Sequence, residues 1–465
     1  MLLEKKLLET LIATGMATGA DFAEIFCENK TAHNFQMIGG LVEKASASKI
    51  QGVGIRLAQG FESVYGFSNH LDPDSLIELA GNLAKSFTGE IHAPKPLGEC
   101  EKGSHHLIKI SPLSVSQADK VALMKRAHTA AKNYDPLIQQ VTVSLGDSVQ
   151  EVLIATSEGR YVTETRGRVR MYINAIAGKD GMMQTGGEGP GSGKGYEYFL
   201  EDIHIEDYAI SAAKVAKTML LADECPGGVM PVVIDNRFGG VIFHEACGHS
   251  LEATSVAKNA SVFSGKLGER IASPIVTAID DGTIENGWGS ANFDDEGYPQ
   301  QRRVLIDKGI LTSYMIDFLN ARRMKQQPTG SSRRESYKYA PTSRMSNTYI
   351  DKGESTLAEI IANTPYGLYA KKMGGGSVNP GSGDFNFAVS EGYMIRDGKI
   401  AEAVRGASLV GNGSEILHKI DMVADNLDRD RGMCGSVSGS IPADVGQPAL
   451  RVSSITVGGK KGGAK

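Results

Sequence analysis

The sequence predicts an α+β protein in which N-terminal α/β units precede a large, mostly antiparallel β C-terminal domain that carries a metal-binding helix. Apolar residues recur at helical spacing in only a few segments. Elsewhere they alternate with polar residues in short runs bounded by glycines, which indicates strands. Turn signals that end in glycine and have apolar flanks predict antiparallel hairpins at residues 280–282, 307–309 and 396–398.

The first unit, residues 1–98, is predicted as a helix, several strands and a second helix. The apolar spacing predicts helices over residues 2–17 and 72–87. Strands are expected between them at residues 22–28, 34–38, 41–45, 51–58 and 63–67. A proline-rich stretch at residues 92–98 is expected to be the linker that ends this unit.

The second unit, residues 112–222, is predicted as a β-meander between two helices. The helices are expected over residues 116–134 and 205–222, and three or four strands over residues 139–177. Residues 186–195 are rich in glycine and are expected to form a flexible loop. They do not match a phosphate-binding loop, because Glu188 replaces the first required glycine and Gly195 replaces the required Ser or Thr.

The third unit, residues 223–457, opens with a buried strand at residues 229–234. A helix is expected from about residue 236 onward, followed mostly by short strands and turns. Residues 458–465, rich in glycine and lysine, are expected to be a flexible tail.

Composition narrows the classes of function. The net charge of −5 and the scattered basic residues argue against a nucleic-acid partner, and no apolar run is long enough to span a membrane. Glu4 and Glu9 interrupt the apolar N-terminus, so it is interpreted as an amphipathic helix rather than a signal peptide. The five cysteines are odd in number and far apart, which favours a reducing compartment and a cytoplasmic location.

The most informative segment runs from Val241 to His249 and contains His244, Glu245 and His249. Two imidazoles next to a carboxylate are what a metallopeptidase needs. The imidazoles hold Zn²⁺, and the carboxylate serves as the general base for a metal-activated water. A structural role for these residues is the competing interpretation, because histidine and glutamate are common on helices.

The spacing of the two histidines is unusual. In the common H-E-x-x-H motif they are four residues apart and lie about 40° apart around the helix, whereas a spacing of five gives about 140°. We therefore predict a π-bulge between His244 and His249, or a distortion near Gly248. Gly239 and Gly240 are expected to allow close backbone approach at the start of the helix.

A third protein ligand must come from outside this pair. The residues leave four candidates open: Cys434, His418, Glu252 and Cys247. Cys434 lies in a glycine-flanked segment where a thiolate could approach a metal. Cys247 is also explained as a small buried apolar residue, and Glu252 as a hydrogen-bond partner of a ligand.

Several motifs resemble those of the TldD/PmbA family, on the TldD side. The segment FHEACGHSLEA at 243–253 is similar to the metal motif of that family. Other stretches match in the same order and are densest after residue 224: ECPGG at 224–228, DDGT at 280–283, DDEG at 294–297, RRESY at 333–337, RMSNTYI at 344–350, GDF at 383–385, LVGNG at 409–413 and the segment 433–448.

The resemblance implies a metallopeptidase with one Zn²⁺ per chain. It implies His244, His249 and Cys434 as metal ligands and Glu245 as the catalytic acid/base. It also implies that the substrate is an unfolded peptide and that the partner is a paralogous PmbA/TldE-type subunit, or a second copy in a homodimer. The segment after Cys434 departs from the family, which often has a lysine following the Cys-Gly pair.

Two other functions compete with this one. The first is a non-enzymatic regulatory module of the gyrase-modulator type, and the second is a different metal-dependent hydrolase such as an amidase. The acidic turns at 280–281 and 294–296 are interpreted as ordinary solvated turns rather than a second metal site. Arg333, Arg334 and Glu335 are expected either to form an ion-pair network or to bind a substrate terminus.

Overall fold

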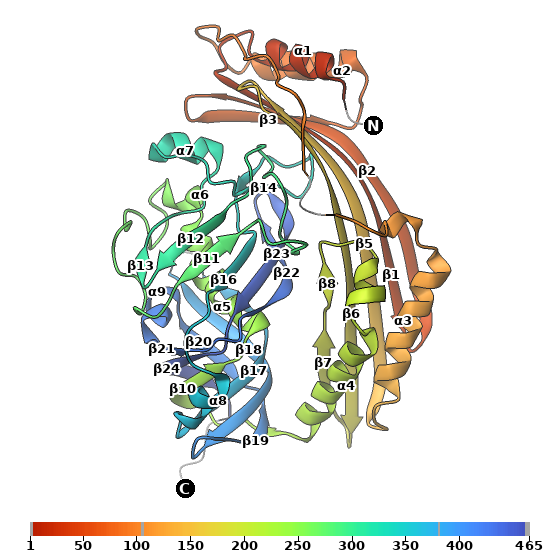
Figure 1. Ribbon diagram of the computed structural model, residues 1–465, viewed down its shortest axis with the longest axis vertical. Coiled ribbons are helices and arrows are strands. Elements are labelled where there is room, and N and C mark those ends of the chain that lie inside the picture. The colour runs from red at the N-terminus through yellow and green to blue at the C-terminus, as the bar shows by residue number, and fades with distance from the viewer. Residues whose placement is uncertain (1–2, 104–106, 380–381, 461–465) are drawn as a thin grey trace.

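The computed structural model describes residues 3–103, 107–379 and 382–460, and its fold is α+β, as predicted (Figure 1). An N-terminal half is built on one long curved sheet, and a C-terminal half is built from shorter strands. Among the described residues, no helix combines the length and apolar character needed to cross a membrane. Residues 461–465 of the expected tail lie outside the described residues, and the preceding strand runs to Gly458.

The long sheet has eight strands, and its main path runs in the order β3-β2-β1-β5-β6-β4. β7 and β8 both pair with β6 outside that path. The strands are β1 Phe22–Ile38, β2 Leu41–Gln59, β3 Glu62–Ser68, β4 Glu101–Lys102, β5 Ile138–Thr156, β6 Tyr161–Lys179, β7 Met182–Glu188 and β8 Gly191–Ser192.

These strands are longer than predicted. The expected pairs 22–28 with 34–38 and 41–45 with 51–58 are single strands, and residues 139–177 form two strands rather than three or four. The register between β1 and β5 continues without a break from Glu24↔Thr156 to Ile38↔Thr142. Polar residues that look like turns in the sequence are therefore paired along the middle of the sheet.

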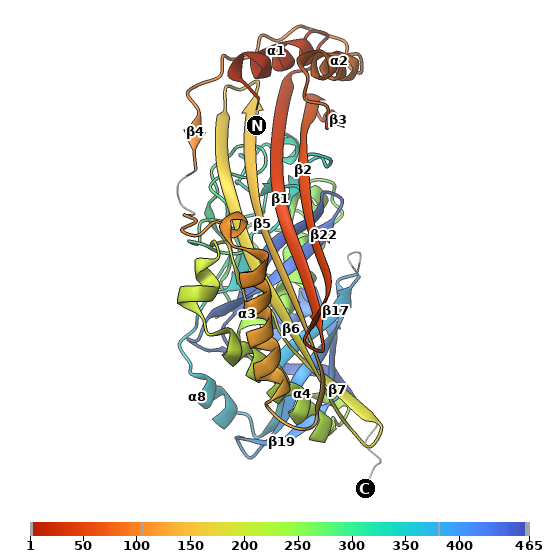
Figure 2. The ribbon, with the colours of Figure 1, turned by 90° about the vertical axis from the view of Figure 1, so that its right-hand side faces the viewer.

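Two pairs of helices pack on opposite ends of this sheet (Figure 2). They are α1 Lys5–Gly15 with α2 Pro73–Ala84, and α3 Gln117–Lys132 with α4 Ile205–Leu221. Each pair has its own hydrophobic core against the strands. The expected units 1–98 and 112–222 thus contribute separate cores but share one sheet.

The glycine-rich stretch at 186–195 is only partly a loop, contrary to the prediction. Residues up to Glu188 continue β7, and Gly191–Ser192 pair with β6. A Cβ on Gly186 would lie 2.2 Å from the carbonyl oxygen of Ala212 in α4. The glycine is required because the helix lies directly on the strand at this point.

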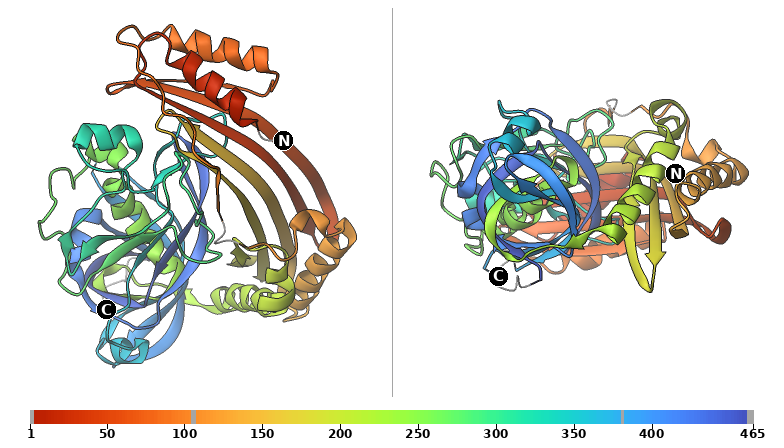
Figure 3. Two further views of the ribbon diagram at one scale, coloured as in Figure 1. Left: turned by 45° about the horizontal axis from the view of Figure 1, so that its top comes forward. Right: turned by 90° about the horizontal axis from the view of Figure 1, so that it is seen from below.

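The C-terminal half contains a closed sheet and a six-stranded sheet. The pairings β17-β10-β24-β20-β18-β17 close a ring, which is visible end-on in Figure 3. β9, β19 and β21 extend the closed sheet. Its strands are β9 Asp223–Glu224, β10 Gly228–Ile234, β17 Tyr366–Val378, β18 Asp384–Arg396, β19 Lys399–Arg405, β20 Ser408–Asn412, β21 Ile420–Val423 and β24 Leu450–Gly458.

The second sheet runs in the order β13-β12-β11-β16-β23-β22. Its strands are β11 Ala278–Asp281, β12 Arg302–Asp307, β13 Ile310–Leu311, β16 Asn347–Ile350, β22 Asp428–Ser436 and β23 Gly439–Gln447. The remaining strands and α-helices are the strand pair β14 Ser332–Arg333 and β15 Thr342–Ser343, and the helices α5 Val241–Phe243, α6 Ala253–Val256, α7 Phe318–Met324, α8 Leu357–Ala362 and α9 Gly413–Ile416.

Two of the three predicted hairpins are confirmed. The turns at 307–309 and 396–398 join β12 to β13 and β18 to β19, and their central residues have positive φ. The third prediction, at 280–282, is wrong, because β11 pairs with β12 some twenty residues farther on, with Asp281 opposite Arg302. The Asp280 carboxylate accepts hydrogen bonds from Ser346 and Thr348 of the adjacent segment instead of capping a turn.

Candidate metal centre

The helical segment that follows β10 is distorted where the histidine spacing predicts it. One α-helical turn, Val241–Phe243, leads into a π-helical turn, His244–Gly248, and then into a 3-10 turn, His249–Leu251. The backbone N–H of His249 donates to the carbonyl of His244, five residues earlier. This wider turn returns residues five apart to the same side of the helix, so the predicted π-bulge is confirmed.

Close packing holds this segment in place. A Cβ on Gly240 would lie 2.4 Å from the backbone of Gly446 in β23, and one on Gly248 would lie 2.3 Å from the sulfur of Met345. Ile242 and Phe243 are buried in the same core as strands of both C-terminal sheets. The expected close approach at Gly240 is confirmed, and the helical segment packs against strands of both C-terminal sheets.

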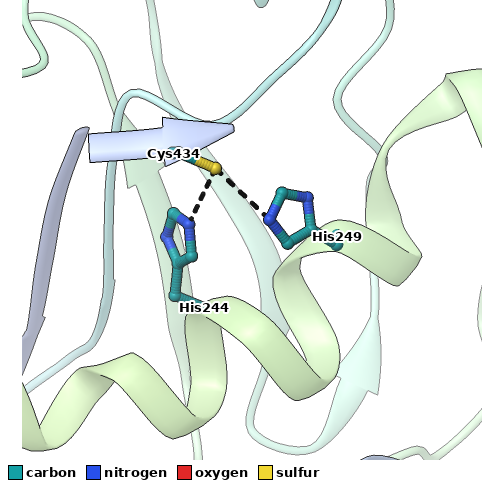
Figure 4. Close-up of side chains that lie close together, drawn as sticks. All are labelled: His244, His249 and Cys434. Atoms are coloured by element: carbon teal, nitrogen blue, oxygen red, sulfur yellow. Dashed lines mark hydrogen bonds between the residues drawn. The ribbon is translucent and has the colours of Figure 1, made fainter. Parts of the chain in front are cut away.

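Three side chains converge at this turn (Figure 4). The sulfur of Cys434, on β22, lies 3.2 Å from Nε2 of His244 and 3.3 Å from Nε2 of His249. The two imidazole rings are 5.2 Å apart and nearly perpendicular. His244 and Cys434 are buried, and His249 is partly exposed. Residues far apart in the sequence thus present two nitrogens and one sulfur to one point.

The thiol of Cys434 has an unusual protonation state in this setting. Burial alone would raise its pKa, but hydrogen bonds from His244 and His249 outweigh that effect and lower the pKa to about 4. Burial would also lower the pKa of His249, but the nearby Glu252 carboxylate and Cys434 raise it well above the ordinary value. The cluster therefore favours a thiolate, which is the form of cysteine that binds metals.

A further layer of contacts orients the histidine and the cysteine. Nδ1 of His249 hydrogen-bonds to Glu252 at 3.1 Å, which leaves Nε2 directed toward Cys434. Arg344 is fully buried, lies 3.8 Å from Glu252, and donates to the backbone oxygen of Cys434 at 2.6 Å. No local sequence pattern singles out Arg344, because its contact with the strand of Cys434 depends on long-range packing.

Glu245 lies beside the cluster without joining it. Its carboxylate is 3.7 Å from Nε2 of His249 and its side chain is about a third exposed, unlike that of the buried His244. A carboxylate at this position is within reach of a proton on a small molecule held between the cluster and solvent.

The donor set fits a transition-metal ion. The potential ligand atoms of His244, His249 and Cys434 lie within 4.8 Å of one another, and no other group of three or more such side chains occurs in the described ranges. Tetrahedral zinc would separate a nitrogen from a sulfur ligand by about 3.6 Å, close to the distances here. Nε2 of His244 faces the cluster, 3.2 Å from the sulfur, whereas Nδ1 is buried without a hydrogen-bond partner in the part of the chain described.

The other candidates for a third ligand have different contacts. Cys247 is buried in the core, where its thiol contacts the carbonyl of Gly413 and burial raises its pKa. Glu252 is the hydrogen-bond partner of His249, and His418 does not belong to the cluster. The acidic segments at 280–281 and 294–296 are buried, so the prediction of solvated turns is wrong; they make ion pairs and hydrogen bonds, as in the contact of Asp295 with Arg166 at 2.7 Å.

Comparison with known proteins gives consistent results along the chain. Models of the PmbA/TldA metallopeptidase family match residues 23–86 (domain 1), 110–220 (central domain) and 227–459 (C-terminal domain). A curated relative, the metalloprotease TldD homolog of Haemophilus influenzae, is 37% identical over 449 residues, which is 94% of this chain and 93% of that protein.

Solved structures share the fold. A putative modulator of DNA gyrase from Thermotoga maritima has a TM-score of 0.81 at 21% identity, covering 97% of this chain and 99% of that one. TldE from Thermococcus kodakarensis has a TM-score of 0.77 at 19% identity, with the same coverage. At these identities the likeness concerns the fold alone.

Proposed function

The chain belongs to the PmbA/TldA metallopeptidase family, and from this premise we propose that it is a zinc-dependent peptidase acting on unfolded peptides. The observation that carries the proposal is the convergence of His244, His249 and Cys434 at one point beside Glu245. Neither a binding module nor a structural helix requires a low-pKa thiolate, two imidazoles and an adjacent free carboxylate together.

His244, His249 and Cys434 are the proposed ligands of one zinc ion per chain. Two imidazoles and a thiolate, with a fourth position open, form a donor set known from catalytic zinc sites. When bound, the ion would supply Lewis acidity, polarising the scissile carbonyl and lowering the pKa of a water molecule. Thiolate ligation favours softer ions such as zinc over magnesium or calcium.

Glu245 is the proposed general acid/base. Its partial exposure and its distance of 3.7 Å from His249 support this role, in which it would accept a proton from the attacking water and return it to the leaving amine. His244 is too buried for that role, and Glu252 is already engaged with His249.

The proposed partner is a paralogous TldE-type subunit, with a homodimer as the alternative. Support comes from the shared fold with TldE of Thermococcus kodakarensis and from the family resemblance. We propose a cytoplasmic location, because all five cysteines are free thiols.

A regulatory role as a gyrase modulator is the second candidate function. It is suggested by the Thermotoga maritima protein described above as a modulator of DNA gyrase, which shares the fold at 21% identity. That role would not depend on Glu245 or on metal, so one experiment separates the two functions.

The decisive test compares wild-type protein with Glu245→Ala, each prepared with and without a TldE-type partner. Elemental analysis should find about one zinc per chain in both proteins, because Glu245 is not a ligand. Cleavage of an unfolded peptide, followed by mass spectrometry, should be present in wild type and absent in Glu245→Ala. Cleavage by the variant would refute the role of Glu245, and wild-type protein that holds no metal would favour the regulatory function.

A further inference from the structure

A cavity of about 620 Å³ lies between the long sheet and the β22–β23 hairpin. β1, β5 and β6 form one wall, and the segment around Arg333 together with Met433 forms the other. Figure 1 shows the inner face of the sheet opposite this hairpin. Met433 directly precedes Cys434 in β22, so the cavity and the metal centre share a strand.

Six basic side chains line the cavity, and only some of them have an acidic partner. Arg166 pairs with Glu164 and Asp295, and Arg334 pairs with Glu24. In contrast, Lys30, Arg168, Arg170 and Arg333 have no carboxylate within 4.0 Å among the described residues; they are the open cations of the cavity.

The open cations use only part of their hydrogen-bonding capacity. Nε of Arg168 donates to the backbone oxygen of Trp288 at 3.1 Å, and Nη1 of Arg333 donates to that of Met345 at 2.8 Å. Arg333 is 94% buried, given its exposed fraction of 6%. A guanidinium has five N–H donors, so each side chain retains several for a ligand.

The acidic residues in the cavity wall are engaged elsewhere. Asp147 pairs with Lys120 at 2.6 Å, and Asp295 pairs with Arg166. Glu335 accepts a hydrogen bond from the backbone N–H of Ser440 at 2.7 Å. None of these three carboxylates lies within ion-pair distance of Lys30, Arg168 or Arg333 in the described ranges.

The guanidinium groups of Arg168 and Arg333 repel each other, and the nearby Asp295 carboxylate offsets part of that repulsion. Burial and the neighbouring guanidinium groups lower the pKa of Arg168 to about 9 and that of Arg333 to about 10. Arginine remains charged at neutral pH, so an anion in the cavity would meet guanidinium groups that have no carboxylate within 4.0 Å in the described chain. Guanidinium groups bind carboxylate and phosphate oxygens in pairs, which makes an oxyanion the matching ligand.

We propose that this cavity is an oxyanion-binding site for the acidic side chains or the C-terminal carboxylate of a peptide substrate. A second hollow of about 590 Å³ shares Arg170, Tyr172 and Met433 with the first. Together they extend along the inner face of the sheet, a shape that suits an extended chain better than a small ion. The peptide source rests on the proposed peptidase function, whereas oxyanion binding does not.

The test measures peptide binding rather than cleavage. Two fluorescent unfolded peptides of equal length, one with glutamates and one with glutamines at the same positions, are titrated with metal-loaded full-length protein carrying Glu245→Gln. Fluorescence anisotropy should show the glutamate peptide binding about tenfold more tightly or better.

Substitutions in the same background locate the site. Arg168→Gln and, separately, the less buried Lys30→Gln should each reduce the preference for glutamate several-fold, while binding of the glutamine peptide stays unchanged. Arg270→Gln is the matched control, because Arg270 is exposed and lies outside the cavity. Circular dichroism identifies any variant that fails to fold, and the other variant then carries the test.

Inorganic phosphate, titrated by calorimetry, distinguishes the two sources of oxyanion. Phosphate binding that is lost in Arg168→Gln, with equal affinity for both peptides, supports the site and identifies a free anion as its ligand. Equal peptide affinities without phosphate binding, or a glutamate preference retained in both variants, would overturn the inference. A wild-type protein that prefers the glutamate peptide but cleaves no peptide would refute the peptidase proposal alone.

Discussion

The Glu252–His249 contact allows a quantitative test of how the metal centre is organised. Glu252 is almost fully buried, its Oε1 lies 3.1 Å from Nδ1 of His249, and Arg344 lies 3.8 Å from the same oxygen. Glu252→Gln keeps the shape of the side chain and removes its charge. We expect zinc to bind more weakly, because a neutral acceptor orients the imidazole less strongly and makes it a weaker donor.

The expected loss is about 10- to 100-fold in Kd, or about 1.4–2.7 kcal/mol, the range typical of partners that hydrogen-bond to a metal ligand. A charge-assisted hydrogen bond is roughly twice as strong as a neutral one, which accounts for about 1 kcal/mol of that loss. We expect Glu252→Gln to fall inside this range for two reasons. Nδ1 of His249 has a single hydrogen bond, and Arg344 has no other carboxylate within 4.0 Å in the described chain.

The loss should depend on pH. The Glu252 carboxylate raises the pKa of His249, against the effect of burial. It therefore also strengthens the binding of the proton that competes with the metal for His249. Removing the charge lowers that pKa and weakens the competition. The ratio of variant to wild-type Kd should therefore be largest in alkaline solution, where His249 is neutral in both proteins, and should shrink as the pH falls.

The assay is competition for zinc with a chromophoric chelator at several pH values. Glu415→Gln is the control, because Glu415 is exposed and pairs only with Lys419. A Kd within twofold of wild type at alkaline pH, or a loss that grows as the pH falls, would refute the reasoning.

Three further predictions concern the same site. Cys434→Ser should reduce zinc retention to below about half an ion per chain after dialysis, because a hydroxyl is a much poorer zinc ligand than a thiolate. Unchanged zinc content on elemental analysis would mean that another residue binds the ion. In metal-free protein, thiolate absorbance near 240 nm should persist at neutral pH and disappear as the pH falls through about 4. Cys27 and Cys225 should not contribute to this signal, because their pKa values are raised to about 12 and 11. A Cys434→Ser protein with the same titration would contradict the prediction. Gly248→Ala should lower the free energy of unfolding by about 1–3 kcal/mol and reduce zinc content, because its Cβ would meet Met345. Gly435→Ala, at an open position beside Cys434, is the control and should change neither quantity. Equal effects of the two variants in chemical denaturation would exclude the packing argument.

Local patterns predicted the elements that depend on neighbouring residues. The four long helices begin and end within three residues of their expected ends, because their apolar residues recur at helical spacing. Two hairpins were predicted correctly because their turns carry a glycine signal between apolar residues. Strand lengths were underestimated, because pairing on both sides holds the polar middle of β1 in the sheet and local composition does not report such pairing.

For the candidate metal centre, local sequence was enough to predict the two histidines, the adjacent glutamate and a π turn, since residues five apart cannot face one point on an ordinary helix. Of the four candidates Cys434, His418, Glu252 and Cys247, the folded chain brings the Cys434 sulfur next to Nε2 of both histidines, because β22 packs against that turn. Tertiary packing likewise determines the surroundings of Arg344 and of the open cations of the cavity. The residues that surround these side chains are distant in the sequence. Ion pairs between such distant residues are not reported by any local periodic pattern.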